Sequence, residues 1–142
     1  MNTDPSRPDS AADRDTAATA MRHWRAGAAS GDWSRLVAML DPDVVFHVPV
    51  AGFGGIQQGV AVATRFFDHL SDVLRADLTV TSTLRTGERD GERVGFEVSV
   101  RGSMDGRRFS QALCLVFLVR HGEVLAFHEY IAWPGGLAAE AA

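Results

Sequence analysis

The chain has 142 residues, of which 46% are hydrophobic and 23% are charged, as expected for one ordinary globular domain. All fourteen basic residues are arginine, which excludes chemistries that need a lysine ammonium, such as a Walker-type phosphate loop or a Schiff base. The formal net charge of -4 opposes nucleic-acid binding, because a phosphate backbone needs a net basic face. The single cysteine, Cys114, can form no internal disulfide, and a domain of this length needs none to fold.

The first thirteen residues are polar and carry two prolines without an apolar period, so we predict a disordered leader over residues 1–13. The leader has no hydrophobic segment typical of a signal peptide. The longest apolar run, residues 112–119, is too short to span a bilayer. We therefore expect a cytoplasmic protein with one domain over residues 14–136 and a flexible tail over residues 137–142.

Three amphipathic helices are predicted in the first half of the chain. The first covers residues 15–30, where apolar side chains recur at three- and four-residue steps. The second covers residues 33–40, with Asp32 as its N-cap and the following Asp-Pro-Asp sequence as its end. A β-branched strand over residues 44–50 and a glycine-rich loop come next. The third helix then has one apolar face, made of Val60, Ala63, Phe67, Leu70 and Leu74.

The second half of the chain predicts an antiparallel sheet. Alternating apolar residues indicate four strands, at 78–85, 93–101, 109–119 and 123–133. Turn signals separate them, and the sharpest are the hairpin sequences Asp105-Gly106 and His121-Gly122. Helices followed by a meander of strands predict an α+β fold, in which the helices pack on one face of a curved sheet.

Glu129 is the most informative single residue. It lies in the last predicted strand, in the middle of an alternating set that is otherwise bulky and apolar: Leu125, Phe127, Glu129, Ile131 and Trp133. A carboxylate in such a stripe loses hydration, and its pKa is raised toward neutrality, as a general acid or base requires. The alternative is a glutamate that faces solvent or pairs with an arginine.

Four segments follow one another in a characteristic order and spacing: GDWSRLVAMLDPDVVFHVP, QQGVAVATRFF, ERVGFEVSVRGSMDG and HGEVLAFHEYIAWPG. With them the chain resembles the SnoaL-like branch of the nuclear transport factor 2-like superfamily, from about residue 17 to residue 134. The resemblance implies a cone-shaped fold, with three N-terminal helices packed on a curved, mainly antiparallel sheet that encloses an apolar pocket. It also implies a homodimer and no obligatory cofactor. Members include polyketide cyclases, limonene epoxide hydrolase and ketosteroid isomerase, besides binding domains, so the fold does not decide the function.

The resemblance also points to site residues. Glu129 falls where limonene epoxide hydrolase has the aspartate that acts as its base, and His47 falls on its water-positioning asparagine. We predict that His47 shuttles a proton, orients a water or holds Glu129, the alternative being a core histidine bonded to a backbone carbonyl. Gly95 stands where that enzyme has its acid, and Ala132 where many cyclases have an aspartate, so neither mechanism transfers directly. His128 and Tyr130 are expected on the opposite strand face, at a dimer contact.

Substrate binding is assigned to bulky side chains that could form the wall of a pocket for a flat polycyclic or terpenoid ligand. The residues predicted for this role are Trp24, Trp33, Phe53, Phe67, Phe117, Phe127 and Ile131; core packing is the alternative for each. We predict no metal, because the five histidines lack the spacing of metal ligands. No serine lies in a nucleophile elbow.

The leading hypothesis is therefore a cofactor-independent enzyme of secondary metabolism. It would act on a small apolar, oxygenated substrate such as a polyketide, by acid-base catalysis that leads to cyclisation, isomerisation or dehydration. The first alternative is an epoxide hydrolase or epoxide-opening cyclase. The second is a non-catalytic domain for ligand binding or dimerisation, which the missing carboxylates at Gly95 and Ala132 favour.

Overall fold

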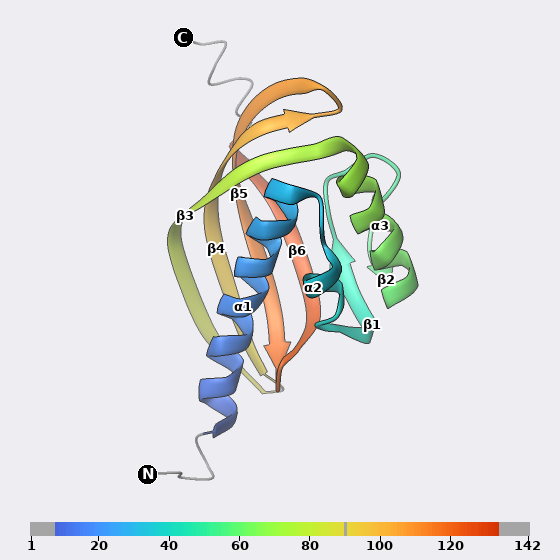
Figure 1. Cartoon of the computed structure of the whole chain (residues 1–142). Helices are drawn as coiled ribbons and strands as arrows, with labels where there is room; N and C mark the ends of the chain where they lie inside the picture. Colours follow the sequence, from blue (N-terminus) through green and yellow to red (C-terminus); the bar gives the residue numbers. More distant parts are fainter. Residues whose placement is uncertain (1–7, 90, 134–142) are drawn as a thin grey trace.

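Helices open the chain and long strands close it in the computed structural model, which describes residues 8–89 and 91–133 (Figure 1). The helices are α1 (Pro8–Ser30), α2 (Ser34–Val37) and α3 (Val60–Val73), and the strands are β1 (Leu40–His47), β2 (Gln57–Gln58), β3 (Leu74–Glu88), β4 (Gly91–Met104), β5 (Arg107–Arg120) and β6 (Glu123–Trp133). The predicted tail at 137–142 and the first seven residues of the predicted leader lie outside the described residues. None of the described helices is long and apolar enough to cross a membrane.

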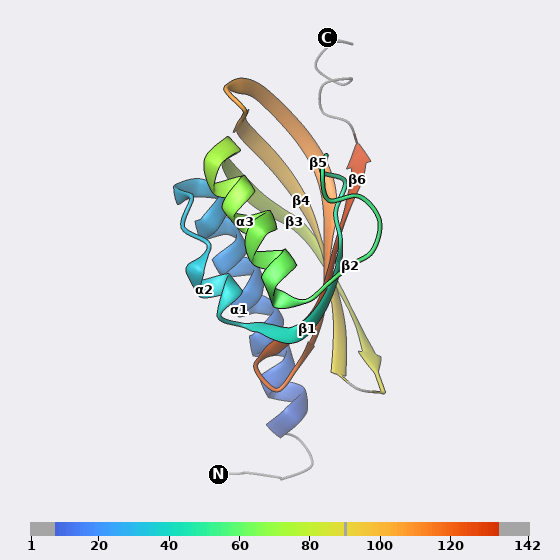
Figure 2. The same cartoon turned by 90° about the vertical axis from the view of Figure 1, so that its right-hand side faces the viewer.

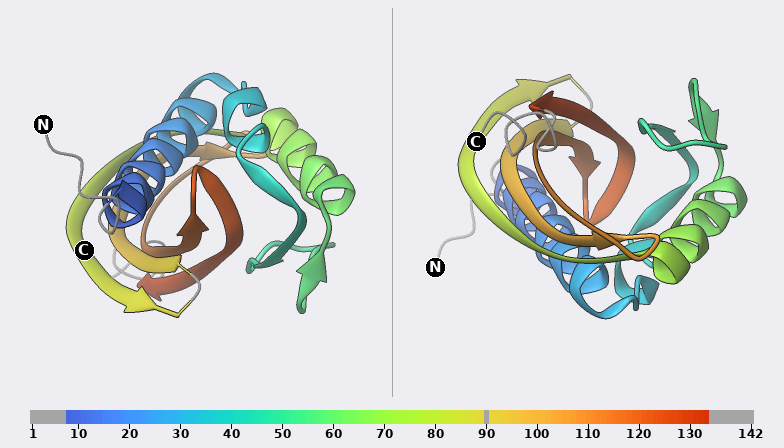
Figure 3. Two further views of the ribbon diagram at one scale, coloured as in Figure 1. Left: turned by 90° about the horizontal axis from the view of Figure 1, so that it is seen from below. Right: turned by 90° about the horizontal axis from the view of Figure 1, so that it is seen from above.

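The strands form one six-stranded sheet in the order β2-β1-β6-β5-β4-β3. Every neighbouring pair is antiparallel except β1 and β6, which run parallel. The helices cover one face of the sheet and leave the other uncovered (Figure 2). Seen along its length, the sheet curves strongly without closing (Figure 3). The predicted α+β fold, with three helices on a curved, mainly antiparallel sheet, is confirmed.

The two predicted hairpin turns have the backbone conformation that their sequences favour. Asp105 and Gly106 both have positive φ angles, of 52° and 80°, and His121 and Gly122 have angles of 52° and 85°. Two consecutive positive φ values define the tight turns whose twist matches that of the flanking strands. The β4–β5 and β5–β6 ladders consequently begin at these turns and extend beyond the predicted strand ends.

The first helix begins at Pro8, seven residues before the predicted start, so residues 8–13 of the predicted leader are helical. The apolar period predicts only the part of the helix that carries it, and the first turns need no such period. Proline is tolerated at the first helical position, which agrees with a helix that begins at Pro8.

The second helix is shorter than predicted, and the strand after it begins earlier. Asp32 accepts hydrogen bonds from the backbone N–H and hydroxyl of Ser34, at 3.0 and 2.7 Å, so it closes a turn, and Trp33 occupies the N-cap position. Pro42 lies inside β1, where the β1–β6 register shifts between Leu40 and Val45. Proline has no N–H to donate to a neighbouring strand, and a residue at such an irregularity does not need to donate one.

The core lies between the helices and the concave face of the sheet. Its largest fully buried side chains are aromatic: Phe46, Phe66, Phe67, Phe117 and Phe127. The indole of Trp24 meets the rings of Phe67, Phe117 and Phe127 edge-on, with centroids 5.4 to 6.0 Å apart. Aromatic pairs in this geometry are favourable beyond the area they bury, so Trp24 is held firmly. It is the side chain that joins the core to the cavity described next.

Candidate active site

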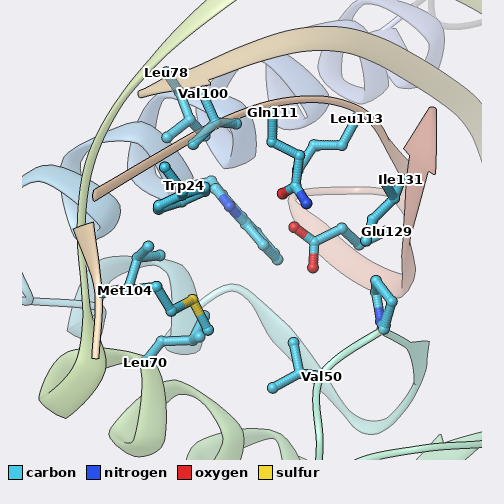
Figure 4. A pocket seen from close by; sticks show the side chains of 13 residues that line it. Trp24, Val50, Leu70, Leu78, Val100, Met104, Gln111, Leu113, Glu129 and Ile131 are labelled. Carbon is cyan, nitrogen blue, oxygen red and sulfur yellow. The ribbon is translucent and has the colours of Figure 1, made fainter. Parts of the chain in front are cut away.

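A cavity of about 280 Å³ opens beside the core, between α1, the end of α3 and the curved ends of β3 to β6. Most of its wall is apolar, and two polar side chains enter it. The residues around it are Trp24, Pro49, Val50, Leu70, Leu74, Leu78, Val100, Met104, Phe109, Gln111, Leu113, Glu129 and Ile131 (Figure 4). A mostly apolar hollow with few convergent polar groups is the usual form of a small-molecule site.

Strand register explains why these residues meet. Leu78 pairs with Val100, which pairs with Gln111, and Leu113 pairs with Ile131 on the next ladder. Residues directly opposite in a ladder point to the same face of the sheet, and every second residue along a strand does so too. The inward face of four strands therefore forms one continuous wall, and Trp24 of α1 closes it from the opposite side.

Glu129 presents its carboxylate to this cavity (Figure 4). Burial raises its pKa from 4.5 to about 7. No hydrogen bond or ion pair within residues 8–89 and 91–133 engages the group, so nothing nearby offsets the loss of hydration. A carboxyl with a pKa near neutrality is present in both protonation states, and it can therefore take or give a proton at physiological pH.

Gln111 is the second polar group, and its amide points into the same cavity (Figure 4). A carboxamide offers two N–H donors and one acceptor without carrying charge. Sequence reasoning missed this residue, although the signal was available. Gln111 interrupts the apolar alternation of Phe109, Leu113, Leu115 and Phe117 in the same way that Glu129 interrupts that of β6.

His47 does not share the cavity, which corrects its predicted partnership with Glu129. In the parallel ladder of β1 and β6, His47 pairs with His128, so the two side chains lie on the same face. The ring of His47 is 6.4 Å from that of His128 and 6.3 Å from that of Tyr130, on the outer face of the sheet. Because Glu129 alternates with these two neighbours, it points inward while His47 points outward.

The predicted aromatic wall divides into two groups. Trp24 and Ile131 line the cavity. Trp33, Phe67, Phe117 and Phe127 do not: they are buried behind Trp24 as part of the core. Phe53 packs on Phe66 and His69, also away from the cavity. The wall is instead mainly aliphatic, because the cavity lies where the strands diverge from the aromatic centre.

The remaining expectations concern Gly95 and a metal site. Gly95 lies at an outward position of β4, whose inward residues Val94, Phe96 and Val98 are buried, so a side chain at position 95 would not face Glu129. Within the described part of the chain, no group of three or more histidine, cysteine, aspartate or glutamate residues could hold a metal ion.

Residues 10–127 match the family model of the SnoaL-like domain. The chain belongs to the SnoaL-like family. This membership agrees with the architecture described above and with a small-molecule cavity enclosed by the sheet and its helices. No curated protein sequence matches the chain.

Solved structures show the same fold. A nuclear transport factor 2-like protein from Anabaena variabilis is 24% identical, with 95% of this chain and 97% of that chain covered, and a TM-score of 0.75. A polyketide cyclase candidate from Xanthomonas campestris is 21% identical over 83% and 91% of the two chains, with a TM-score of 0.60. An epoxide hydrolase of the limonene type from Mycobacterium tuberculosis is 18% identical over 82% and 83%, with a TM-score of 0.63.

The raised pKa of Glu129 predicts how stability depends on pH. A pKa of about 7 in the folded protein means that folding holds this proton more tightly than the unfolded chain, where the value is near 4.5. The stabilisation is complete below about pH 4.5 and is lost as the pH rises through about 7, by about 3 kcal/mol in total. Glu129→Gln should remove this dependence and exceed the wild type in stability at about pH 8.

Urea unfolding of both proteins from about pH 4 to 8 measures this difference. Glu97 is an exposed carboxylate on β4, and Glu97→Gln is the matched control. Its curve should run parallel to that of the wild type. If the Glu129→Gln curve were also parallel, the carboxyl would be well hydrated in the folded state.

Proposed function

We propose that this protein is an enzyme that moves protons on a small, apolar, oxygenated molecule, with Glu129 as its general acid and base. The observation that carries the proposal is the carboxyl group of Glu129 in an apolar cavity, where burial raises its pKa to about 7. A group with this pKa combines a useful fraction of the basic form with a good driving force for proton transfer. The resulting reaction is an isomerisation, or a cyclisation when the activated carbon attacks a second group.

The two polar side chains of the cavity have complementary roles in such a reaction. The carboxylate of Glu129 removes a proton from a carbon next to a carbonyl, and negative charge develops on the carbonyl oxygen. An N–H of Gln111 donates a hydrogen bond to that oxygen, where a preorganised donor in a water-poor site is most effective. The protonated Glu129 then returns the proton at another atom. Trp24 and the aliphatic wall hold the substrate in position meanwhile.

Cavity volume limits the substrate. A protein cavity of roughly 150 Å³ accommodates benzene, which corresponds to about 25 Å³ for each non-hydrogen atom. The cavity here, about 280 Å³, then takes about 11 such atoms. This size fits a monocyclic terpenoid or a single-ring polyketide better than the flat polycyclic ligand first considered.

Epoxide opening is the second candidate reaction. The Mycobacterium tuberculosis epoxide hydrolase shares the fold, and Glu129 could activate a water for attack on an epoxide. Among the described residues that line the cavity, Glu129 is the only carboxylate, so no second acid is placed to protonate the epoxide oxygen. Gln111 can donate a hydrogen bond there but cannot supply the proton, so proton abstraction next to a carbonyl is favoured.

The outer face of the sheet fits the homodimer that the family resemblance implies. The outward residues at the centre of β5, Cys114, Val116 and Leu118, are small or apolar, and Tyr130 beside them is 49% exposed. We propose that a second copy covers this patch. Sedimentation of the purified chain as a monomer at micromolar concentration would contradict this. The cytoplasmic location stays a prediction.

Hydrogen exchange in D₂O tests the proposed chemistry without knowledge of the product. Monocyclic ketones of the size given above are first screened by NMR for binding at the cavity, and bound compounds are then followed for deuterium uptake next to the carbonyl. We expect uptake with the wild type and with Glu97→Gln, and none with Glu129→Gln. If compounds that bind the cavity show no catalysed uptake, the protein is a binding domain; solvent oxygen incorporated from an epoxide would establish the second reaction instead.

A further inference from the structure

A second hollow lies on the outer face of the sheet, on the opposite side of β4 and β5 from the Glu129 cavity. We propose that it binds the phosphate group of a small, soluble phosphate monoester, with Arg101 and Arg108 as its main ligands. The hollow measures about 830 Å³, and its wall is formed mostly by charged and hydroxyl-bearing residues: Arg75, Asp77, Thr79, Ser99, Arg101, Gly102, Ser103, Arg108, Phe109 and Ser110. None of the helices in the described part of the chain covers this face (Figure 2).

Register brings the two arginines together. Arg101 pairs with Ser110, and Ser103 pairs with Arg108, so the arginines are diagonal neighbours on β4 and β5. Diagonal neighbours in a ladder have Cα atoms about 7–8 Å apart, a separation that long side chains bridge easily. Both guanidinium groups can therefore reach one anion, with the hydroxyls of Ser103 and Ser110 between them.

Gly102 borders the hollow and allows β3 and β4 to approach closely. A side chain at this position would collide with the carbonyl oxygen of Arg75 and with Ala76, so only glycine allows β3 and β4 to approach so closely. Gly102 itself and Phe109 border the hollow, and Phe109 also borders the Glu129 cavity. The hairpin of β4 and β5 therefore separates the outer hollow from the Glu129 cavity.

The positive charges of the arginines in the hollow are only partly balanced, because Asp77 is the one carboxylate among the described residues that line it. Arg101 and Arg108 are exposed, and neither takes part in a hydrogen bond or ion pair with another described residue. Arg75 is already engaged, because its Nη1 donates to the carbonyl oxygens of Ser71 and Leu74 at 2.7 and 2.6 Å. Asp77 pairs in register with Arg101 and opposes an anion. Although the chain has a net charge of -4, these two arginines, which have no partner among the described residues, make the hollow locally positive, so it attracts anions.

The donor set favours phosphate over a carboxylate. One guanidinium satisfies both oxygens of a carboxylate through two parallel hydrogen bonds. Two guanidinium groups and several hydroxyls supply more donors than a carboxylate can accept, whereas the three terminal oxygens of a phosphate monoester can accept from both guanidinium groups and from the hydroxyls. The volume around the anion leaves room for an attached organic group.

Titration of the full chain with inorganic phosphate and with glycerol 3-phosphate, at low salt, tests the proposal. Backbone N–H and arginine Nε–H NMR signals around Arg101 and Arg108 should shift and saturate, with a Kd of about a millimolar for two charge-assisted contacts. Arg101→Gln and Arg108→Gln should each weaken binding about tenfold. Asp77→Asn removes the opposing charge and should strengthen it.

Arg107→Gln is the matched control, because it removes the same charge from the adjacent residue, which points to the other side of β5. It should leave the affinity unchanged. Absence of saturation, or equal weakening by Arg107→Gln, would overturn the proposal, since the attraction would then be a general effect of charge. Binding only to vesicles that contain phosphatidate, without a response to soluble monoesters, would overturn it too.

Discussion

Replacing Glu129 by glutamine should lower turnover by about 10²- to 10⁴-fold, the usual contribution of a positioned acid or base. Glutamine keeps the size and shape of the side chain but cannot accept a proton at physiological pH. Ligand binding should change little, because the cavity wall is mostly apolar and stays in place. A large loss in kcat with a nearly constant KM would therefore identify a chemical role.

The pH profile of the wild type gives an independent measurement. With Glu129 as the base in the first step, kcat/KM should fall as the pH decreases through about 7, because burial raises the pKa of this carboxyl to about 7. Glu97→Gln, which removes an exposed carboxylate from β4, should keep both the rate and the profile. Full activity in Glu129→Gln would assign catalysis to another group, and an unaltered profile with reduced activity would mean that Glu129 only shapes the cavity.

Gln111→Leu separates the two polar groups of the cavity. If its amide donates to the developing oxyanion, the leucine variant loses turnover while the pKa seen in the profile moves upward, because Glu129 loses its last polar neighbour in the cavity. Gln111→Glu would place a second carboxyl beside the first and should raise the apparent pKa values of the pair further. A profile unaffected by both changes would show that Gln111 does not act on the reacting atoms.

The alternation of apolar residues along the last strand was enough to predict that Glu129 points toward the apolar side of the sheet, because alternation depends only on the backbone pleat. Alternation along β5 places Gln111 in the cavity in the same way. An uncharged amide costs less to bury than a carboxylate, so its position in an apolar stripe is a weaker sign of a functional site. His47 shows where local patterns fail. Its orientation relative to Glu129 depends on the parallel pairing of β1 with β6, which places His47 beside His128. The sequence of neither strand shows which other strand it pairs with.

The division between core and cavity could not be predicted either. The side chains of Phe67, Phe117 and Phe127 would suit the wall of a pocket equally well, but they are buried where the helices pack directly on the sheet. The cavity forms further along, where the ends of the strands curve away from the helices and aliphatic residues such as Leu78 and Val100 face the space. That curvature is a property of the whole sheet, set by its twist and its long hairpins.

Phe127→Ala should destabilise the protein by about 3–5 kcal/mol, the usual cost of removing a buried aromatic ring. The Phe127 ring is fully buried, stacks on Phe46 at 4.8 Å and lies against Phe67 and Trp24 at 5.5 and 5.6 Å. Alanine would leave a cavity that these rigid rings cannot fill by small shifts. Urea unfolding monitored by tryptophan fluorescence measures the loss.

Leu84→Ala is the control, because Leu84 is 73% exposed and should change stability by less than about 0.5 kcal/mol. The aromatic cluster also holds Trp24, the wall opposite Glu129, so Phe127→Ala should loosen that wall and weaken ligand binding even where the variant is fully folded. A stable variant with unchanged affinity would mean that the core repacks and that Trp24 is positioned by α1 alone. Loss of stability together with loss of affinity would show that the inward face of β6 does two things at once: Phe127 builds the core that fixes the cavity, and Glu129, two residues later, supplies its chemistry.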